Sequence, residues 1–107
     1  MRMTTFNDRE TAFENKFAHD AELQFKVNAR RDKLTGLWAA GLLGHTGEAA
    51  EAYAKSVVIA DLAHAGDDDI IGKLVTDLAA TGTDEAAIRA QLALNDGEAR
   101  RQIMDSL

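Results

Sequence analysis

Residues 6–40 read FNDRETAFENKFAHDAELQFKVNARRDKLTGLWAA and contain all four phenylalanines and the one tryptophan of the chain. Residues 6–33 contain neither glycine nor proline, the two residues that most weaken a helix. The apolar residues recur at helical spacing in two stripes, first Phe6, Phe13, Phe17, Ala21 and Phe25, and then Leu23, Val27, Leu34, Leu37 and Trp38. We therefore predict one long helix from about Asn7 to Ala40, with two rotated apolar faces that meet two different partners.

Glycines and helix-capping residues divide the rest of the chain into three further predicted helices. Thr46 is the expected N-cap of a helix over about residues 47–65. Asp67 is the expected N-cap of the third helix, which ends at Gly82, and Thr83 that of the fourth. The expected buried stripes of these helices are Ala49, Tyr53, Val57, Ala60 and His64; then Ile71, Leu74, Val75 and Leu78; then Ile88, Leu92, Ala99, Ile103 and Leu107.

Amphipathic helices joined by short loops bury their stripes together as a compact bundle. The chain has 107 residues and no proline, and 46% of its residues are hydrophobic, which fits one helical domain over residues 1–107. The predicted fold is therefore all-α, a four-helix bundle with a long N-terminal helix. Within the last helix, the poor helix formers of residues 95–97 predict a kink or a break.

Charge is distributed unevenly along the chain. The net charge is −6, which argues against general nucleic-acid binding. Residues 1–33 carry a net charge of +1, whereas residues 34–107 carry −7. Two interpretations stay open for the opening segment. It is either a solvated helix beside an acidic bundle, or a docking arm whose mixed charges match the surface of a partner.

The residue types of most catalytic and metal sites are missing or poorly spaced. The chain has no cysteine, and His19, His45 and His64 lack the spacing of a helical metal site. The acidic run at residues 67–69 lacks the alternating oxygen ligands of a calcium loop and fits the start of a helix. We therefore expect no catalytic residue, no metal and no enzyme activity. No signal peptide or membrane helix is expected, and the predicted location is the cytoplasm.

One basic cluster remains in the first predicted helix. It comprises Lys26, Arg30, Arg31 and Lys33, followed by Trp38. The cluster is either a solvated face beside a core tryptophan, or a weak anion site in which the cations hold phosphates and the ring contacts a base. The sequence alone leaves both open.

Three segments together resemble the zeta subunit of alphaproteobacterial F-type ATP synthases. They are residues 3–40, MTTFNDRETAFENKFAHDAELQFKVNARRDKLTGLWAA, then GHTGEAAEAYAKSVV, and AGDDDI. The resemblance covers residues 3–71, with Gly41 and residues 62–64 departing from the usual pattern. It implies a four-helix bundle that inhibits ATP hydrolysis by the synthase, and therefore a location beside the inner membrane.

The resemblance also assigns roles to residues. It implies that an inhibitory segment, residues 1–19, inserts at a catalytic α/β interface near the γ shaft. The expected apolar anchors are Phe6, Phe13 and Phe17, and the charges expected to set the register are Asp8, Arg9, Glu10, Glu14 and Lys16. For each phenylalanine the alternative is packing onto the bundle itself, and the two states can alternate between free and bound protein.

The resemblance further implies binding of an adenine nucleotide, ADP or ATP, as a weak ligand and not as a required cofactor. The expected partners are the α, β and γ subunits of the synthase, with a monomer when free. Two other hypotheses stay open: a nucleotide sensor built on the Lys26–Trp38 region, and a plain helical adaptor for another complex.

Overall fold

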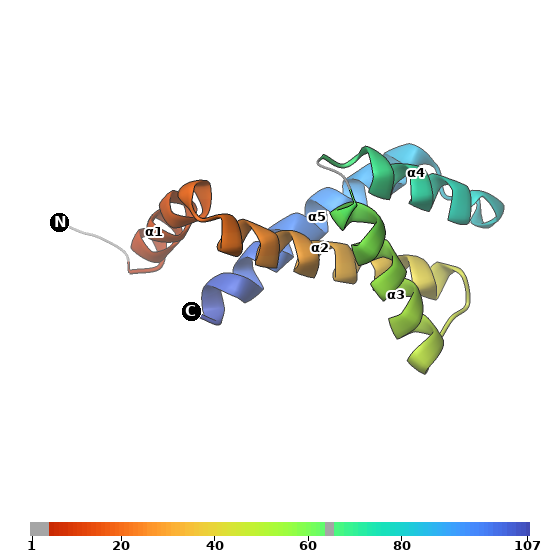
Figure 1. Ribbon diagram of the computed structural model, residues 1–107, viewed down its shortest axis with the longest axis horizontal. Coiled ribbons are helices and arrows are strands. Elements are labelled where there is room, and N and C mark those ends of the chain that lie inside the picture. Colours follow the sequence, from red (N-terminus) through yellow and green to blue (C-terminus); the bar gives the residue numbers. More distant parts are fainter. Residues whose placement is uncertain (1–4, 64–65) are drawn as a thin grey trace.

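The computed structural model describes residues 5–63 and 66–107, without the side chains of residues 5–7. The described elements are all helical: α1 (Thr5–His19), α2 (Ala21–Leu42), α3 (Gly47–Leu62), α4 (Asp68–Asp77), the short 3-10 helix η1 (Ala79–Thr81) and α5 (Glu85–Asp105). Figure 1 shows α2 and α5 running side by side along the length of the molecule, with α3 and α4 packed at one end. The predicted all-α class is confirmed.

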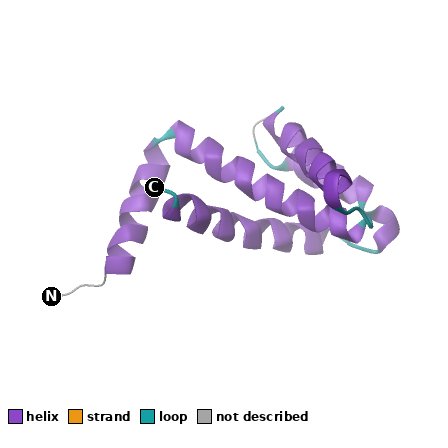
Figure 2. Ribbon diagram, turned by 90° about the horizontal axis from the view of Figure 1, so that it is seen from below, coloured by secondary structure: helices purple, strands orange, loops and turns teal. Residues whose placement is uncertain are grey.

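The predicted single helix over residues 7–40 is in fact two helices, α1 and α2, separated at Asp20. The backbone of Asp20 is extended (φ −115°, ψ 103°), and its side chain accepts a hydrogen bond from the Leu23 backbone N–H at 3.1 Å. The side-chain amide of Gln24 also donates to the Phe17 carbonyl oxygen at 2.8 Å. An N-cap aspartate starts a new helix direction without any glycine or proline, which is why helical spacing alone missed the break. Figure 2 shows α1 turned sharply from α2 and lying beside the C-terminal end of α5.

The main core lies where α2, α3, α4 and α5 meet. It is built from Ala39, Val57, Ile70, Ile71, Leu74, Leu78, Ile88 and Leu92, with Trp38, Leu43 and Tyr53 packed against it. The axes of α2 and α3 come close because Gly36 has no side chain. A Cβ built on Gly36 would lie 2.7 Å from the Ala54 Cα.

A second apolar cluster joins α1 to α2 and α5. It comprises Phe13, Leu23, Val27, Ala99, Ile103 and Met104, with Phe17 and Leu34 at its margin. The predicted change of apolar face along residues 6–40 therefore reflects two packing environments. The described side chains of α1 pack in this second cluster, whereas α2 contributes side chains to both clusters.

Several predicted helix ends are confirmed and two are corrected. The third predicted helix, expected to end at Gly82, ends at Asp77 as α4 and is followed by η1. Thr46 and Asp67 occupy the N-cap positions of α3 and α4. Asp84, and not Thr83, is the N-cap of α5, because its carboxylate accepts from the Ala87 N–H at 2.9 Å. Gly82 follows η1 in the left-handed conformation (φ 79°).

The predicted kink at residues 95–97 is absent, and α5 is continuous through them. Asn95 is buried there and donates a side-chain hydrogen bond to the Thr35 hydroxyl of α2 at 3.0 Å. A tertiary contact thus outweighs the weak helix propensity of asparagine. Val75 and Leu107 are more exposed than their stripes predict, at 37% and 69%, and Ala49 is also exposed. The predicted core position His64 lies outside the described residues.

Candidate functional site: the docked N-terminal helix

The candidate site is α1 together with its seat on α2 and α5. Phe13 is 4% exposed and lies in the second cluster, and Phe17 is partly buried beside it, with 6.2 Å between the two ring centres. The side chain of the third predicted anchor, Phe6, lies outside the described part of the chain. The two described anchors therefore pack onto the bundle in this state.

Charged pairs flank this apolar seat. The guanidinium of Arg100 on α5 donates to the Glu14 carboxylate at 2.7 Å and lies 4.1 Å from the centre of the Phe17 ring. Arg9 meets Asp105 at 3.4 Å, with both side chains about half exposed. These contacts tie both ends of α1 to the C-terminal half of α5.

Arg100 is held in place for this role by its own helix. Its Nε donates to Asp96, one turn earlier, at 2.9 Å. Partial burial opposes the charge on Arg100, but Asp96 and Glu14 outweigh that effect and raise its pKa. The side chain therefore presents a fixed positive charge to α1.

The remaining predicted charges of α1 are exposed to solvent. Asp8 and Glu10 are exposed, and Lys16 is exposed with its Nζ 4.0 Å from Asp20. Together with Arg9 and Glu14, they place alternating charge on a surface that a partner can reach. Phe13 and Phe17 pack between these charged side chains, against α2 and α5.

The predicted basic cluster of α2 does not form one site. Lys26 pairs with Glu22 on the same helix, whereas Arg30 donates to Gln102 on α5. Lys33 instead faces α3, with its Nζ 3.8 Å from Glu51. The other two members, Arg31 and Trp38, point into the interior, where Arg31 is buried and Trp38 packs against the main core. Because a helix turns by 100° per residue, side chains that are close in the sequence point to several different faces of α2.

Arg31 is the centre of a buried charge network. Its guanidinium contacts Asp32 on α2 at 3.0 Å, Asp61 on α3 at 3.2 Å and Asp67, the N-cap of α4, at 3.1 Å. Burial opposes its charge, but the three carboxylates outweigh burial and raise its pKa. Its charge is thus directed at two buried carboxyl groups and at the half-exposed Asp67, which makes Arg31 a structural residue of the α2–α3–α4 junction.

Asp32 has an unusual environment within this network. It is fully buried, and burial, followed by a hydrogen bond with Asp61, raises its pKa to about 8 although Arg31 acts in the opposite direction. Among the described residues, neither Asp32 Oδ2 nor Asp61 Oδ1 has a conventional hydrogen-bond donor.

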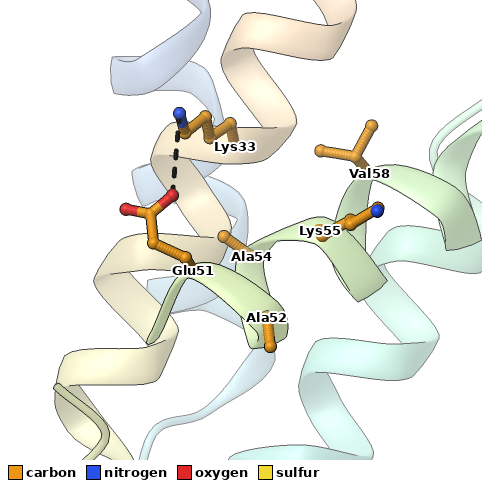
Figure 3. Close-up of a pocket in the computed structure, with 6 residues that line it drawn as sticks. All are labelled: Lys33, Glu51, Ala52, Ala54, Lys55 and Val58. Carbon is orange, nitrogen blue, oxygen red and sulfur yellow. Dashed lines mark ion pairs between the residues drawn. The ribbon is translucent and has the colours of Figure 1, made fainter. Parts of the chain in front are cut away.

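An open pocket of about 420 Å³ lies between α2 and α3. Its lining residues are Lys33, Glu51, Ala52, Ala54, Lys55 and Val58. Figure 3 shows Lys33 and Glu51 joined across its edge, while Lys55 extends away from that carboxylate. The pocket combines a mainly apolar wall with two ammonium groups.

The sequence missed the residues that hold α1 in place. Arg100 and Asp105 contact residues 86 and 96 positions away in the chain, a distance that no local pattern encodes. Asp61 was missed as well, because no sequence motif marks it as a partner of Arg31. For Asp67, the sequence predicted the N-cap position but not the contact with Arg31.

Two further observations concern the described residues. None of their helices combines the length and apolar character needed to cross a membrane. Nor do their His, Asp and Glu side chains gather in a group of three or more that is suited to a metal ion.

Fold and site together define a small all-helical protein whose N-terminal helix, rich in charge and phenylalanine, is docked by its apolar face. A family model described as ATPase inhibitor subunit zeta matches residues 3–102, and the chain belongs to that family. Members of this family are regulatory, non-catalytic subunits that inhibit ATP hydrolysis by the ATP synthase.

A structure determined by solution NMR shares 45% sequence identity with this chain. The match covers 79% of this chain and 99% of that one, with a TM-score of 0.72. Comparison with curated proteins found no match.

Proposed function

We propose that this chain stops ATP hydrolysis by inserting α1 at a catalytic α/β interface of the ATP synthase, near the γ subunit. The observation that carries the proposal is the two-sided character of α1. Phe13 and Phe17 form one apolar face, while Asp8, Arg9 and Glu10 carry mixed charge on accessible surface. An apolar helix face with flanking charges is the pattern that binds a groove in a partner.

Insertion requires α1 to leave its seat, because Phe13 is buried against α2 and α5. Burying one phenylalanine contributes about 1.5–3 kcal/mol, and each exposed ion pair about 0–1 kcal/mol. The docked state is therefore held by a few kcal/mol, which a groove of similar apolar area can offset. On this proposal, α1 is docked in the free chain and transferred to the synthase on binding.

The direct test adds the purified chain to a synthase complex stripped of its own inhibitor and measures ATP hydrolysis. We expect the full chain to inhibit, and a chain lacking residues 1–19 to lose inhibition. Circular dichroism of the shortened chain must still show the helices of residues 21–107. Full inhibition by the shortened, folded chain would contradict the proposal.

A charge variant tests binding while it leaves Phe13 and Phe17 in place. Glu10→Lys changes an exposed charge on α1, and Glu48→Lys changes an exposed charge in the first turn of α3. We expect the Glu10 variant to inhibit at least several-fold more weakly and the Glu48 variant to inhibit normally. Equal loss in both would indicate a nonspecific effect of net charge.

The double variant Phe13→Ala with Phe17→Ala is expected to abolish inhibition, but Phe13 also stabilises the free chain. Its thermal unfolding has to be measured alongside its ATPase inhibition. Loss of inhibition with α2 to α5 still folded supports the anchor role, whereas undiminished inhibition opposes it.

Binding of ADP or ATP is the second proposal, and the two ammonium groups at the α2–α3 pocket favour it. We test it by adding ADP while observing backbone amide NMR shifts. Shifts at Lys33, Glu51 and Lys55 would place the phosphates in this pocket, and shifts at Lys26, Arg30 and Trp38 would favour the original basic cluster. A spectrum without shifts would remove both sites.

The same proposal places the chain in the cytoplasm, held beside the inner membrane by the synthase, and makes it a monomer when free. Sedimentation of the purified chain tests the second point, since a dimer would sediment at twice the mass.

A further inference from the structure

Two carboxyl groups meet inside the protein where α2 packs on α3. Asp32 is fully buried and Asp61 is 8% exposed. Both carboxyl groups contact the same guanidinium, that of Arg31, at 3.0 and 3.2 Å, and each keeps one buried oxygen without a hydrogen-bond donor among the described residues. A carboxylate can only accept hydrogen bonds, so these two oxygens can share a hydrogen bond only when one of the groups carries a proton.

The charge balance of the junction points the same way. Among the described residues, Arg31 is the cation in contact with Asp32, Asp61 and the half-exposed Asp67. The buried part of the network sets this one guanidinium against two carboxyl groups, so ionisation of both would leave one uncompensated negative charge. Uncompensated charge is expensive in a buried site, and neutralisation by a proton is the usual outcome. Among the described residues, Asp32 Oδ2 and Asp61 Oδ1 have no N–H or hydroxyl partner that could act instead.

We propose that Asp32 and Asp61 form a buried proton-binding site that joins α2 to α3, occupied by one proton at neutral pH. Loss of this proton leaves two like charges close together and weakens the packing of α2 on α3. The site is separate from the docked α1 and from the α2–α3 pocket, and the proposal does not depend on the proposed insertion.

The charged groups that face the site from the neighbouring elements do not replace the proton. Arg31 on α2 already contacts all three carboxylates, and Asp67 at the start of α4 adds negative charge. On α5, Arg89 and Asp96 line the same hollow as Arg31 and Asp67, but Arg89 pairs with Glu85 at 2.8 Å and Asp96 with Arg100 at 2.9 Å.

The sign of the pH effect follows from the raised pKa of Asp32. Between the ordinary value of 3.8 and about 8, the folded chain keeps a proton that the unfolded chain has lost. The contribution of the pair to stability is therefore fully present below pH 3.8, decreases as pH rises, and is lost once the pH passes about 8.

The first test observes the carboxyl carbons of the native, ¹³C-labelled chain by NMR from pH 3 to pH 10. We expect the Asp32–Asp61 pair to lose one of its protons in a step near pH 8. If the Asp32 carboxyl carbon completes its titration in the ordinary acidic range, the proposal is overturned. This test uses the unmodified protein and so does not depend on how any variant folds.

The second test compares denaturant unfolding of the native chain, Asp32→Asn and the control Asp68→Asn across the same pH range. An asparagine amide donates to Asp61 at every pH, and Asp68 is an exposed carboxylate in the first turn of α4. The unfolding constant of the native chain should rise relative to Asp32→Asn by up to about tenfold per pH unit between pH 4 and 8, as expected for one linked proton. Asp68→Asn should follow the native chain. Parallel pH profiles for the native chain and Asp32→Asn would refute the site.

Discussion

The guanidinium of Arg100 lies 4.1 Å from the centre of the Phe17 ring, at the point where α1 meets α5. The same group holds the Glu14 carboxylate at 2.7 Å, so one side chain makes two contacts with α1. Phe17 and Glu14 are three residues apart and lie on neighbouring positions of the helix surface, which lets one cation reach both. Arg100 is therefore the main polar contact that keeps the proposed inhibitory helix on the bundle.

Arg100→Ala should loosen α1 without unfolding the bundle. A partly exposed cation–π contact and an exposed ion pair contribute about 1 kcal/mol together, which corresponds to roughly a fivefold increase in undocked α1. Hydrogen exchange should rise for residues 8–19 and stay constant in α3 and α4. The matched control is Arg89→Ala, which removes a pair with Glu85 within α5. Faster exchange over the whole chain would mean that Arg100 stabilises the bundle generally.

The same variant separates docking from inhibition. If α1 must leave its seat to bind the synthase, Arg100→Ala lowers the cost of release and should increase the apparent inhibitory affinity by up to about fivefold. ATP hydrolysis by an inhibitor-free synthase complex, titrated with each chain, measures this change. Weaker inhibition by the variant would indicate that Arg100 contacts the synthase, or that α1 stays docked when bound.

Gly36→Ala and Gly97→Ala should have opposite effects on stability. A Cβ on Gly36 would lie 2.7 Å from the Ala54 Cα, so α2 and α3 would have to move apart at a cost of about 1–3 kcal/mol. No atom lies within 4 Å of a Cβ on Gly97 in α5, where alanine should add about 0.5–1 kcal/mol through its better helix propensity. Thermal unfolding of the two variants tests the close approach of α2 and α3, and a stabilising Gly36→Ala would exclude it.

Asn95 and Thr35 should show an energetic coupling across α2 and α5. The Asn95 amide donates to the Thr35 hydroxyl at 3.0 Å, and that hydroxyl donates to the Arg31 carbonyl at 2.9 Å. Asn95→Ala should cost about 1–2 kcal/mol, because a buried hydrogen bond is lost. Combined with Thr35→Val in a double-mutant cycle, it should give a coupling of about 1 kcal/mol. Additive effects would show that the contact contributes nothing to stability.

Tyr53→Phe should change the titration of Asp77. The Tyr53 hydroxyl donates to the Asp77 carboxylate at 2.7 Å, and Lys73 Nζ lies 2.9 Å from the same oxygen. Partial burial raises the pKa of Asp77, but these two donors outweigh it and leave the pKa below its ordinary value. Their stabilisation is therefore present above pH 3.8 and is lost as pH falls through the lowered pKa. In the variant, ¹³C NMR should show a higher pKa for Asp77. An unchanged pKa would mean that Lys73 alone lowers it.

Local sequence patterns predicted the helices well, because a helix depends on neighbours within four residues. The N-caps at Thr46 and Asp67 and most of the buried stripe of α5 follow from such spacing. The break at Asp20 had a local cause too, but an aspartate within a long helical pattern is ambiguous until the direction of the following chain is known. Asn95 shows the opposite case, in which a distant partner stabilises a helix where propensity predicted a kink.

The candidate site was predicted only in part. The resemblance in residues 3–40 led to the proposed inhibitory segment, and the structure shows the charges of its described residues on accessible surface. The basic cluster Lys26–Lys33 looked continuous in sequence, yet helical rotation directs its members to different neighbours. Arg31 then proved to be a buried structural cation and not an exposed anion ligand.

By itself, the sequence determined the all-helical class, the positions of most helix starts and the membership of a regulatory family. These properties depend on short-range periodicity and on motifs that lie within one segment. Only the tertiary structure decided that Phe13 faces inward, that Arg100 secures α1, and that Arg31 holds both Asp32 and Asp61. The Arg100–Phe17 contact joins residues 83 positions apart and the Arg31–Asp61 contact residues 30 positions apart, and such pairs form only when packing of the apolar faces has fixed the direction of every helix.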